Sequence, residues 1–195
     1  MKTAILILAA GSSSRMGKPK QLLPFKNTTL LGNAIEQAKN SKANSVFCVL
    51  GANVDIIQES ISYYKIQTIF NPNFKDGLSS SIVIGIHQHK SNFEKILIIL
   101  ADQPFITSES LNQLLKKSEK NTSKIIATAY DDKAGVPTVF PKNFFQQLLN
   151  LQGDKGAKFF LEKHSSEIIK MKITNLVDID TSEDYKNLIN NVSLS

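Results

Sequence analysis

The chain has 195 residues, of which 42% are hydrophobic and 21% charged, as is typical of a globular protein, and its length predicts a single domain over residues 1–195. Lysine and arginine (23) outnumber aspartate and glutamate (17), and the net charge of +6 suits anionic small molecules. Because the lysines are scattered and not interleaved with aromatic residues, we expect no nucleic-acid partner.

Cysteine content and hydropathy indicate the cellular compartment in which the protein is expected. The single cysteine, Cys48, excludes a disulfide within the chain and suits a reducing environment. The apolar run at the N-terminus is too short to span a membrane and leads into a polar loop with no cleavage-site pattern. We therefore expect a cytoplasmic protein with no membrane partner.

The first predicted element is a buried strand that opens onto a polar loop. Residues 5–10 are uniformly apolar, as expected of a strand buried on both faces of a parallel sheet. The loop after it contains two glycines, three serines and three cations: Gly11, Gly17, Ser12, Ser13, Ser14, Arg15, Lys18 and Lys20. Glycine permits unusual backbone angles, and the other residues supply donors and positive charge. This combination predicts a polyphosphate-binding loop.

Spacing excludes two well-known phosphate-binding motifs. A Walker A loop has four residues between its glycines and Ser or Thr after its lysine, whereas Gly11 and Gly17 enclose five residues and Pro19 follows Lys18. A dinucleotide-binding fingerprint would need a glycine where Ser13 stands. A long basic loop wrapped around the phosphates is the remaining interpretation.

This opening segment resembles the signature loop of the MobA-like nucleotidyltransferases. The matching residues are Leu8-Ala9-Ala10-Gly11, Ser14-Arg15-Met16-Gly17 and Lys20-Gln21-Leu22-Leu23. Within this family the loop is most similar to that of the molybdenum cofactor cytidylyltransferases, because the guanylyltransferases usually have a second glycine where Ala10 stands. Sugar and isoprenoid cytidylyltransferases open similarly.

Strands and helices alternate along the rest of the chain. Strands are predicted at 46–50, 66–70, 95–101, 124–129, 136–140 and 168–173. Helices are predicted at 30–40, 54–63, 78–89, 108–120 and 144–151, then from about 156 and from about 182, with a loop at 131–135 and a frayed end from Asn190 to Ser195. This order predicts a three-layer α/β/α sandwich with a mostly parallel, Rossmann-like sheet and a site along the carboxyl ends of the strands. The resemblance implies the nucleotide-diphospho-sugar transferase type.

Two loops after predicted strands carry candidate nucleotide contacts. Asn53 has two open uses, which are contact with the nucleotide and capping of the following helix. Residues 71–81 resemble a family loop of the form NP-x-aromatic-x-x-G-x-x-x-S, which sits over the base and ribose, and Gly77, Ser80 and Ser81 match it. The two serines either bind the ligand or cap a helix.

Two aspartates are the candidate metal ligands. Asp102 follows the most apolar predicted strand, where a carboxylate is well placed to hold a divalent cation. The family resemblance agrees, since it implies a Mg²⁺ site at an aspartate followed by x-Pro. The later sequence DIDTSED is similar to the DxDTPED ending of the family, and Asp180 matches its second metal ligand. Capping of the following helix remains an alternative for Asp180. Asp178 lies on the same face of an extended segment as Asp180, and whether it also binds the metal stays open.

Two further motifs resemble the acceptor side of the family. Gly135-Val136-Pro137 match a G-x-P stretch, with Val136 where histidine is common. The segment from Gly153 resembles a GDKGAR-like step near the acceptor or pyrophosphate, in which Lys155 and Lys158 meet phosphate or lie on a solvated helix face. His87 and His89 lack further ligands, so we expect surface histidines there.

The resemblance implies nucleotidyl transfer. The terminal phosphate of molybdopterin would attack the α-phosphorus of CTP and release pyrophosphate, with Mg²⁺ on Asp102 and Asp180 and with Arg15 and Lys20 as catalytic cations. The implied nucleotide contacts are Leu8, Ala9, Ala10, Gly11, Lys20, Asn53, Gly77, Ser80, Ser81 and Ala101. A molybdoenzyme or its chaperone is a further expected partner. The alternatives are guanylyl transfer to the same cofactor, transfer to a sugar phosphate or another phosphorylated acceptor, and a nucleotide-binding regulatory module without turnover.

Overall fold

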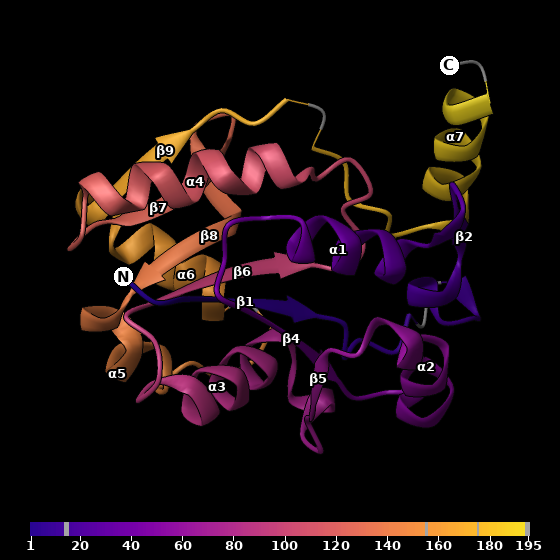
Figure 1. Cartoon of the computed structure of the whole chain (residues 1–195), viewed down its shortest axis with the longest axis horizontal. Coiled ribbons are helices and arrows are strands. Elements are labelled where there is room, and N and C mark those ends of the chain that lie inside the picture. The colour runs from indigo at the N-terminus through magenta and orange to yellow at the C-terminus, as the bar shows by residue number, and fades with distance from the viewer. Residues whose placement is uncertain (14–15, 155, 175, 194–195) are drawn as a thin grey trace.

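The computed structural model of the protein describes residues 1–13, 16–154, 156–174 and 176–193, and its centre is a seven-stranded sheet (Figure 1). The spatial order is β5-β4-β1-β6-β8-β7-β9. The strands are β1 (Thr3–Leu8), β4 (Ser45–Leu50), β5 (Gln67–Phe70), β6 (Lys95–Leu100), β7 (Ile125–Tyr130), β8 (Lys133–Pro141) and β9 (Ile168–Met171). The sheet confirms the predicted fold class.

The sheet is parallel except at β8. β1 pairs in parallel with β4 and β6, β4 with β5, and β7 with β9, whereas β8 runs antiparallel to both β6 and β7. Residues of β1 are buried throughout, because helices cover both faces of the sheet. The carboxyl ends of β1 and β6 therefore lie at one edge, on the right in Figure 1.

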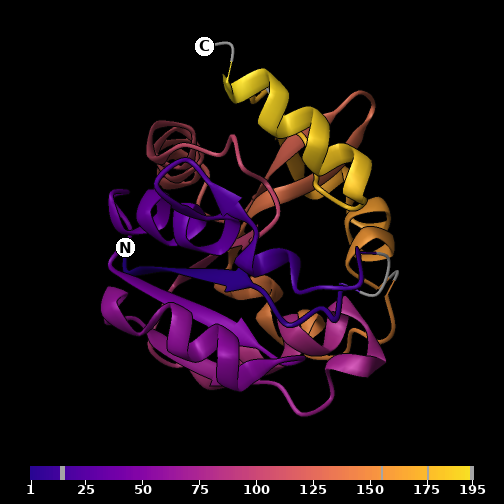
Figure 2. The same cartoon turned by 90° about the vertical axis from the view of Figure 1, so that its right-hand side faces the viewer.

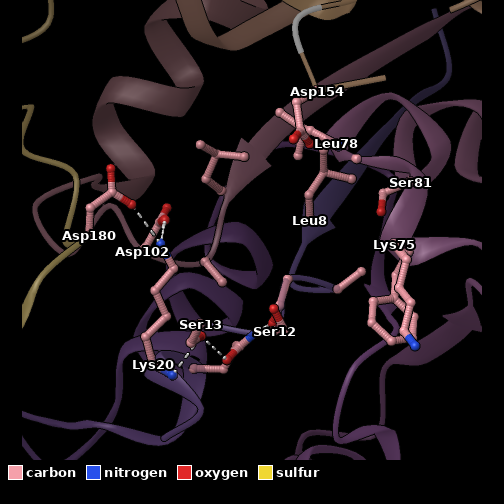
Figure 3. Close-up of a pocket in the computed structure, with 17 residues that line it drawn as sticks. Leu8, Ser12, Ser13, Lys20, Lys75, Leu78, Ser81, Asp102, Asp154 and Asp180 are labelled. Atoms are coloured by element: carbon pink, nitrogen blue, oxygen red, sulfur yellow. Dashed lines mark hydrogen bonds and ion pairs between the residues drawn. The ribbon is translucent and has the colours of Figure 1, made fainter. Parts of the chain in front are cut away.

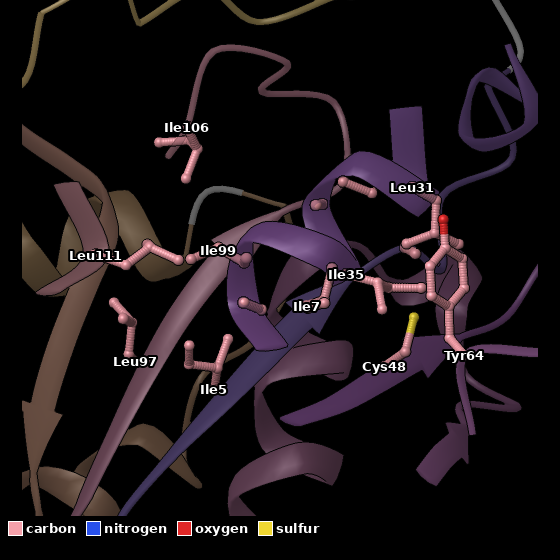
Figure 4. Close-up of a cluster of buried hydrophobic side chains, with 14 of the residues drawn as sticks. Ile5, Ile7, Leu31, Ile35, Cys48, Tyr64, Leu97, Ile99, Ile106 and Leu111 are labelled. Carbon is pink, nitrogen blue, oxygen red and sulfur yellow. The ribbon is translucent and has the colours of Figure 1, made fainter. Parts of the chain in front are cut away.

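Helices cover both faces and complete three layers. On one face α1 (Leu30–Lys39), α2 (Val54–Ser60) and α4 (Ser108–Lys120) contribute to a single apolar cluster, part of which Figure 4 shows around Cys48. On the other face α3 (Leu78–His89), α5 (Phe145–Leu148) and α6 (Gly156–Lys163) pack on a second cluster. The two large clusters are the core that holds the sheet rigid.

A third, smaller cluster supports the site edge. The hairpin of β2 (Pro24–Phe25) and β3 (Thr28–Thr29) packs with α7 (Ser182–Ser193) around the buried side chain of Ile179. α7 projects at the top of the molecule in both views (Figures 1 and 2). This cluster brings the C-terminal segment back to the loop that follows β1.

Local signals explain where the helices begin. The hydroxyl of Thr29 accepts a hydrogen bond from the backbone N–H of Gly32 at 3.0 Å, so it caps α1. α4 begins with a capping box, in which Thr107 and Ser110 bond each other's backbone N–H groups.

Several boundaries differ from the prediction. The expected loop at 131–135 is a tight turn, because Asp131 adopts a φ of 49° and Tyr130 already pairs with Lys133, so β8 starts earlier. The hairpin β2–β3 was not predicted, and its turn contains Lys26 with a φ of 53°. α2 ends at Ser60 and α5 covers only four residues. The expectation of fraying from Asn190 is wrong as far as Ser193, because α7 continues to that residue.

The histidine prediction is wrong at one position. His87 is exposed, but the ring of His89 stacks on Phe47 with 3.7 Å between centroids. Both ring nitrogens of His89 are buried and make no hydrogen bond among the described residues. Burial lowers the pKa of His89 from 6.5. The helical pattern alone did not distinguish the two histidines.

No helix within the described ranges has both the length and the apolar character needed to cross a membrane.

Candidate active site

A cavity of about 710 Å³ opens where the central strands end (Figure 3). Its walls come from the loop after β1, the start of α3, the end of β6 and two later segments. The lining residues are Leu8, Ala10, Gly11, Ser12, Ser13, Lys20, Gln21, Phe74, Lys75, Gly77, Leu78, Ser81, Leu100, Ala101, Asp102, Asp154 and Asp180. The position at the carboxyl ends of parallel strands is that of ligand sites in open α/β folds.

The side chain of Gln21 holds the shape of the predicted phosphate loop. It is 2% exposed, and its Nε2 donates hydrogen bonds to the carbonyls of Ala9 at 2.9 Å and Gly11 at 2.8 Å. The hydroxyl of Ser13 donates to Gln21 Oε1 at 3.3 Å and accepts from the backbone N–H of Lys20 at 3.0 Å. These bonds fold the loop back on itself, so that Lys20 enters the cavity.

Three residues far apart in the sequence form a cluster on one side of the cavity. The Nζ of Lys20 donates to Asp102 Oδ2, to Asp180 Oδ1 at 3.0 Å and to the carbonyl of Ile179 at 3.1 Å (Figure 3). The backbone N–H of Ile179 donates to the carbonyl of Asp102 at 3.0 Å, which ties the two carboxylate segments together. We call Lys20, Asp102 and Asp180 the carboxylate–lysine cluster.

Electrostatics keep Lys20 charged in this cluster. Burial by itself lowers the pKa of Lys20, but the charges of Asp102 and Asp180 and their hydrogen bonds outweigh it, so the pKa is raised above 10.5. The side chains of Lys20 and Asp102 are only 19% and 13% exposed, whereas that of Asp180 is 55% exposed. The inner ion pair is therefore shielded from water, and the outer one faces the solvent.

The two carboxylates fit a divalent cation. Oδ1 of Asp102 is buried and makes no hydrogen bond to any described residue, so the carboxylate has a free coordinating oxygen. Within the described ranges no group of three or more His, Cys, Asp or Glu side chains is suited to a metal. Mg²⁺ is commonly held by one or two carboxylates, with substrate phosphates and water completing its shell. Asp102 and Asp180 suit such an ion.

A second contact closes the opposite side of the cavity. The backbone N–H of Leu78, at the start of α3, donates to Asp154 Oδ1 at 3.1 Å, and that of Ser79 donates to the carbonyl of Gly153 at 3.4 Å. Gly77 adopts a φ of 94°, and a Cβ there would lie 2.3 Å from Asp154 Oδ1. Only glycine allows the two loops to approach this closely.

The structure brings most predicted site residues together. Seven of the ten nucleotide candidates line the cavity: Leu8, Ala10, Gly11, Lys20, Gly77, Ser81 and Ala101. Both metal candidates line it as well. Arg15, the other predicted catalytic cation, and Lys155 lie outside the described residues, and Lys158 is exposed on α6.

Three nucleotide candidates do not line this cavity. Ala9 uses its N–H to bind the carbonyl of Val49 and its own carbonyl to bind Gln21. The hydroxyl of Ser80 donates to the carbonyl of Gly77 at 2.8 Å and accepts from Asn71 Nδ2 at 2.8 Å. These hydrogen bonds hold the end of β1 and the start of α3 in place without facing the cavity.

Asn53 does not cap a helix. It is exposed, with a φ of 55°, and its side chain makes no capping hydrogen bond to α2. The alternative use as a cap is therefore wrong, because the left-handed backbone replaces the extended conformation of a usual N-cap. Its contact with a nucleotide stays a prediction.

Sequence reasoning assigned no role to several residues that shape the site. Gln21 and Asp154 stood inside recognised motifs, and Gln103 directly follows Asp102. Asp178, whose share in the metal stays an open prediction, accepts a hydrogen bond from Gln103 Nε2 at 2.8 Å. The sequence feature that could have identified these residues is their polar character within apolar or glycine-rich stretches.

Comparison with known proteins agrees with this geometry. Residues 5–168 match the MobA-like NTP transferase domain. The chain is 29% identical over 168 residues to nicotine blue oxidoreductase of Paenarthrobacter nicotinovorans, covering 81% of this chain and 80% of that protein. It is 26% identical over 197 residues to the purine catabolism protein PucB of Bacillus subtilis (strain 168), covering 92% of each.

Solved structures show the same fold. Rv0371c from Mycobacterium tuberculosis H37Rv superposes with a TM-score of 0.87 at 25% identity, with 97% of each chain covered. Another structure of Rv0371c is a complex with manganese, with a TM-score of 0.80 at 24% identity, covering 97% of this chain and 99% of that one. Because the family match extends over most of the chain and includes every cavity-lining residue except Asp180, the protein belongs to the MobA-like NTP transferase domain family and is a nucleotidyltransferase.

Proposed function

We propose that the protein transfers CMP from CTP to the terminal phosphate of molybdopterin and releases pyrophosphate, with Mg²⁺ as its metal. The observation that carries this proposal is the carboxylate–lysine cluster beside the predicted phosphate loop in one cavity. Alanine at position 10 supports CTP over GTP, since it stands where the guanylyl branch usually has glycine. A cytoplasmic location and delivery to a molybdoenzyme or its chaperone belong to the same proposal.

The metal has a defined place in this mechanism. Asp102 and Asp180 would hold Mg²⁺, which when bound neutralises phosphate charge during the displacement. Nucleotidyl transfer needs little covalent help from the protein, because in-line positioning and charge neutralisation supply most of the acceleration. The residues of the chain therefore act mainly by orienting the triphosphate.

Lys20 and the phosphate loop provide that orientation. The ammonium of Lys20 lies at the end of a flexible stem, so it can turn from the carboxylates to the α-phosphate, where negative charge shifts in the transition state. Gln21 keeps the loop folded around the phosphates through its bonds to Ala9 and Gly11. Asp154 holds the start of α3 on the opposite wall.

Pyrophosphate release tests the proposal directly. Purified protein is assayed with Mg²⁺ and molybdenum cofactor, while CTP, GTP, ATP and UTP are each supplied in a separate reaction. Release with CTP alone is the expected result. Release with GTP alone would move the protein to the guanylyl branch, and no release with any nucleotide would reject molybdopterin as the acceptor.

The metal ligand is tested by substitution. Asp102→Ala should lose about a hundredfold or more of the Mg²⁺-dependent rate, because the ion loses its most buried carboxylate. Asp132→Ala is the matched control, since Asp132 is an exposed residue of the β7–β8 turn and does not line the cavity. Circular dichroism checks that both variants are folded. Activity of Asp102→Ala equal to that of the control would remove Asp102 from the metal site.

A further inference from the structure

Gln103 is a buried amide that connects four segments of the chain. It is 2% exposed and directly follows Asp102. Its Nε2 lies 2.8 Å from the hydroxyl of Tyr130, 2.8 Å from Asp178 Oδ1 and 3.2 Å from the carbonyl of Val136. These partners belong to β7, to β8 and to the segment that carries Asp180.

The hydrogen-bond pattern determines which way the amide faces. A glutamine amide has two N–H protons, and the hydroxyl of Tyr130 already donates to the carbonyl of Val136 at 2.6 Å. The two amide protons are therefore available for Tyr130 and for Asp178. The reverse orientation would place Oε1 against the carboxylate of Asp178, and two acceptors repel each other.

This arrangement is not the one that stability alone would favour. Oε1 of Gln103 is buried and makes no hydrogen bond to any described residue. An unpartnered buried acceptor is destabilising, and an apolar side chain of similar size would avoid that loss. A buried polar group with half of its capacity unused calls for a role outside stability.

The neighbouring charges indicate what that role is. Asp178 and Asp180 lie two residues apart on the segment that contacts both Lys20 and Asp102. Three carboxylates near one another repel, so the segment at 178–180 needs favourable contacts to stay in place. Gln103 supplies one, and the bond from the N–H of Ile179 to the carbonyl of Asp102 supplies another.

We propose that Gln103 is a positioning residue for the metal-binding carboxylates. By holding Asp178, its amide keeps the segment at 178–180 beside Asp102 and thereby sets the place of the Asp180 carboxylate. This inference rests on the divalent-cation site of the proposed function. It assigns Asp178 to the support of the site, in contact with Gln103, while Asp102 and Asp180 contact the cation.

The binding of Mn²⁺ to the free protein tests this inference. Gln103→Leu has a similar volume and keeps every formal charge, and its Mn²⁺ dissociation constant is measured by electron paramagnetic resonance without nucleotide or acceptor. We expect about tenfold weaker binding in a variant that remains folded, as circular dichroism would check. In the nucleotidyl transfer assay kcat should fall, while KM for the nucleotide stays within about twofold.

Asn33→Leu is the matched control. Asn33 is another buried amide, 3% exposed, whose Nδ2 donates to the carbonyl of Pro104 at 3.0 Å in the segment that follows Asp102. Its side-chain bond goes to a backbone carbonyl and not to a carboxylate, so its loss should leave the Mn²⁺ dissociation constant unchanged even if stability falls. Equal weakening in both leucine variants would overturn the inference.

A double-mutant cycle shows whether Gln103 acts through Asp178. Introduced into an Asp178→Ala background, Gln103→Leu should cause no further weakening of Mn²⁺ binding. Weakening of the same size in both backgrounds would overturn the inference, as would unchanged binding in Gln103→Leu alone. If the leucine variant does not fold, Gln103→Met replaces it in the same cycle.

The outcome is distinguishable from that of the proposed function. Mn²⁺ binding that depends on Gln103 in a protein that releases no pyrophosphate would refute the proposed reaction and support the positioning role. A wild-type protein that binds no Mn²⁺ would overturn the positioning role.

Discussion

The ammonium of Lys20 lies between the two carboxylates at which the sequence predicts a metal ion. Its Nζ contacts Asp102, Asp180 and the carbonyl of Ile179. In the free protein the lysine therefore compensates the repulsion of two like charges. A divalent cation that enters the site competes with this ammonium for the same oxygens.

Removal of the ammonium should separate metal binding from catalysis. In Lys20→Met we expect the free protein to bind Mn²⁺ several-fold more tightly, because the cation no longer displaces a bound ammonium. Turnover should fall about a hundredfold or more, because the α-phosphate loses a positive charge in the transition state. Calorimetric titration with Mn²⁺ and the pyrophosphate assay measure the two effects.

Lys18→Met serves as the control for this experiment. Lys18 lies in the same loop but is exposed, and within the part of the chain that the structure describes no ion pair joins it to Asp102 or Asp180. Its loss should leave Mn²⁺ affinity unchanged. Unchanged or weaker Mn²⁺ binding in Lys20→Met would show that the ammonium does not compete with the cation.

At the scale of elements, the start of α3 depends on a loop from the other half of the chain. Gly77 combines a φ of 94° with contacts that leave no room for a side chain, since a Cβ would lie 2.6 Å from the backbone nitrogen of Asp154. Gly153 also has a positive φ of 66°, but a Cβ there would meet nothing within 4 Å. A comparison of substitutions at these two glycines therefore distinguishes backbone strain, present at both, from steric conflict, present only at Gly77.

Alanine at each glycine should have different consequences. Gly153→Ala should lower the free energy of unfolding by about 1 kcal/mol through strain alone and leave nucleotide affinity nearly unchanged. Gly77→Ala should lose about 2–3 kcal/mol and bind CTP at least tenfold more weakly, because the two loops must separate. Urea unfolding and CTP titration measure both. Equal effects in the two variants would contradict the steric argument.

Packing of α3 against β4 makes stability dependent on pH. Burial lowers the pKa of His89 below its ordinary 6.5, so the unfolded chain binds a proton more readily than the folded one. Well above pH 6.5 the ring is neutral in both states and has no effect. As the pH falls through that value, the unfolded state gains protons first, and the free energy of unfolding decreases.

Substitution of each histidine on α3 tests this cause. In His89→Leu the decrease in unfolding free energy between about pH 7 and pH 5 should be smaller than in the wild type. His87→Leu is the control, because His87 is exposed on the same helix. Urea unfolding at several pH values gives the comparison. Identical pH profiles for wild type and His89→Leu would remove His89 as the cause.

At the scale of the whole molecule, the cavity joins segments from both ends of the chain. A ligand bound there contacts the loop after β1, the start of α3 and the segment before α7 together, so its binding is linked to global folding. CTP with Mg²⁺ at a hundred times its dissociation constant should stabilise the protein by about 2.7 kcal/mol. For a chain of this size the unfolding temperature should rise by roughly 5–10 °C.

Thermal unfolding with matched nucleotides measures this linkage. We expect a larger shift with CTP than with GTP at equal concentration, and the metal-dependent part of the shift should disappear in Asp102→Ala. A shift with CTP that does not depend on Mg²⁺ in the wild type would separate nucleotide binding from the carboxylates.

The sequence by itself determined the order of the helices and of the seven strands of the main sheet, and it located the polar loop after β1. These features are local, because an apolar run such as residues 5–10 or a capping threonine such as Thr29 acts on its own neighbourhood in the chain. The position of Asp102 at the end of a buried strand also follows from local pattern. Family resemblance added the match of Asp180 and the implied nucleotide contacts, among them Gly77 and Ser81.

Only the tertiary structure decided which side chains meet. Lys20 reaches Asp102 across 82 positions and Asp180 across 160, and Gln103 reaches Asp178 across 75. No local pattern encodes such pairs, because they form only once the sheet order places β1 beside β6 and the cluster around Ile179 holds the C-terminal segment against them. The same long-range packing places Asp154 on Gly77 and packs His89 against Phe47, where the lack of further metal ligands had led us to expect a surface histidine.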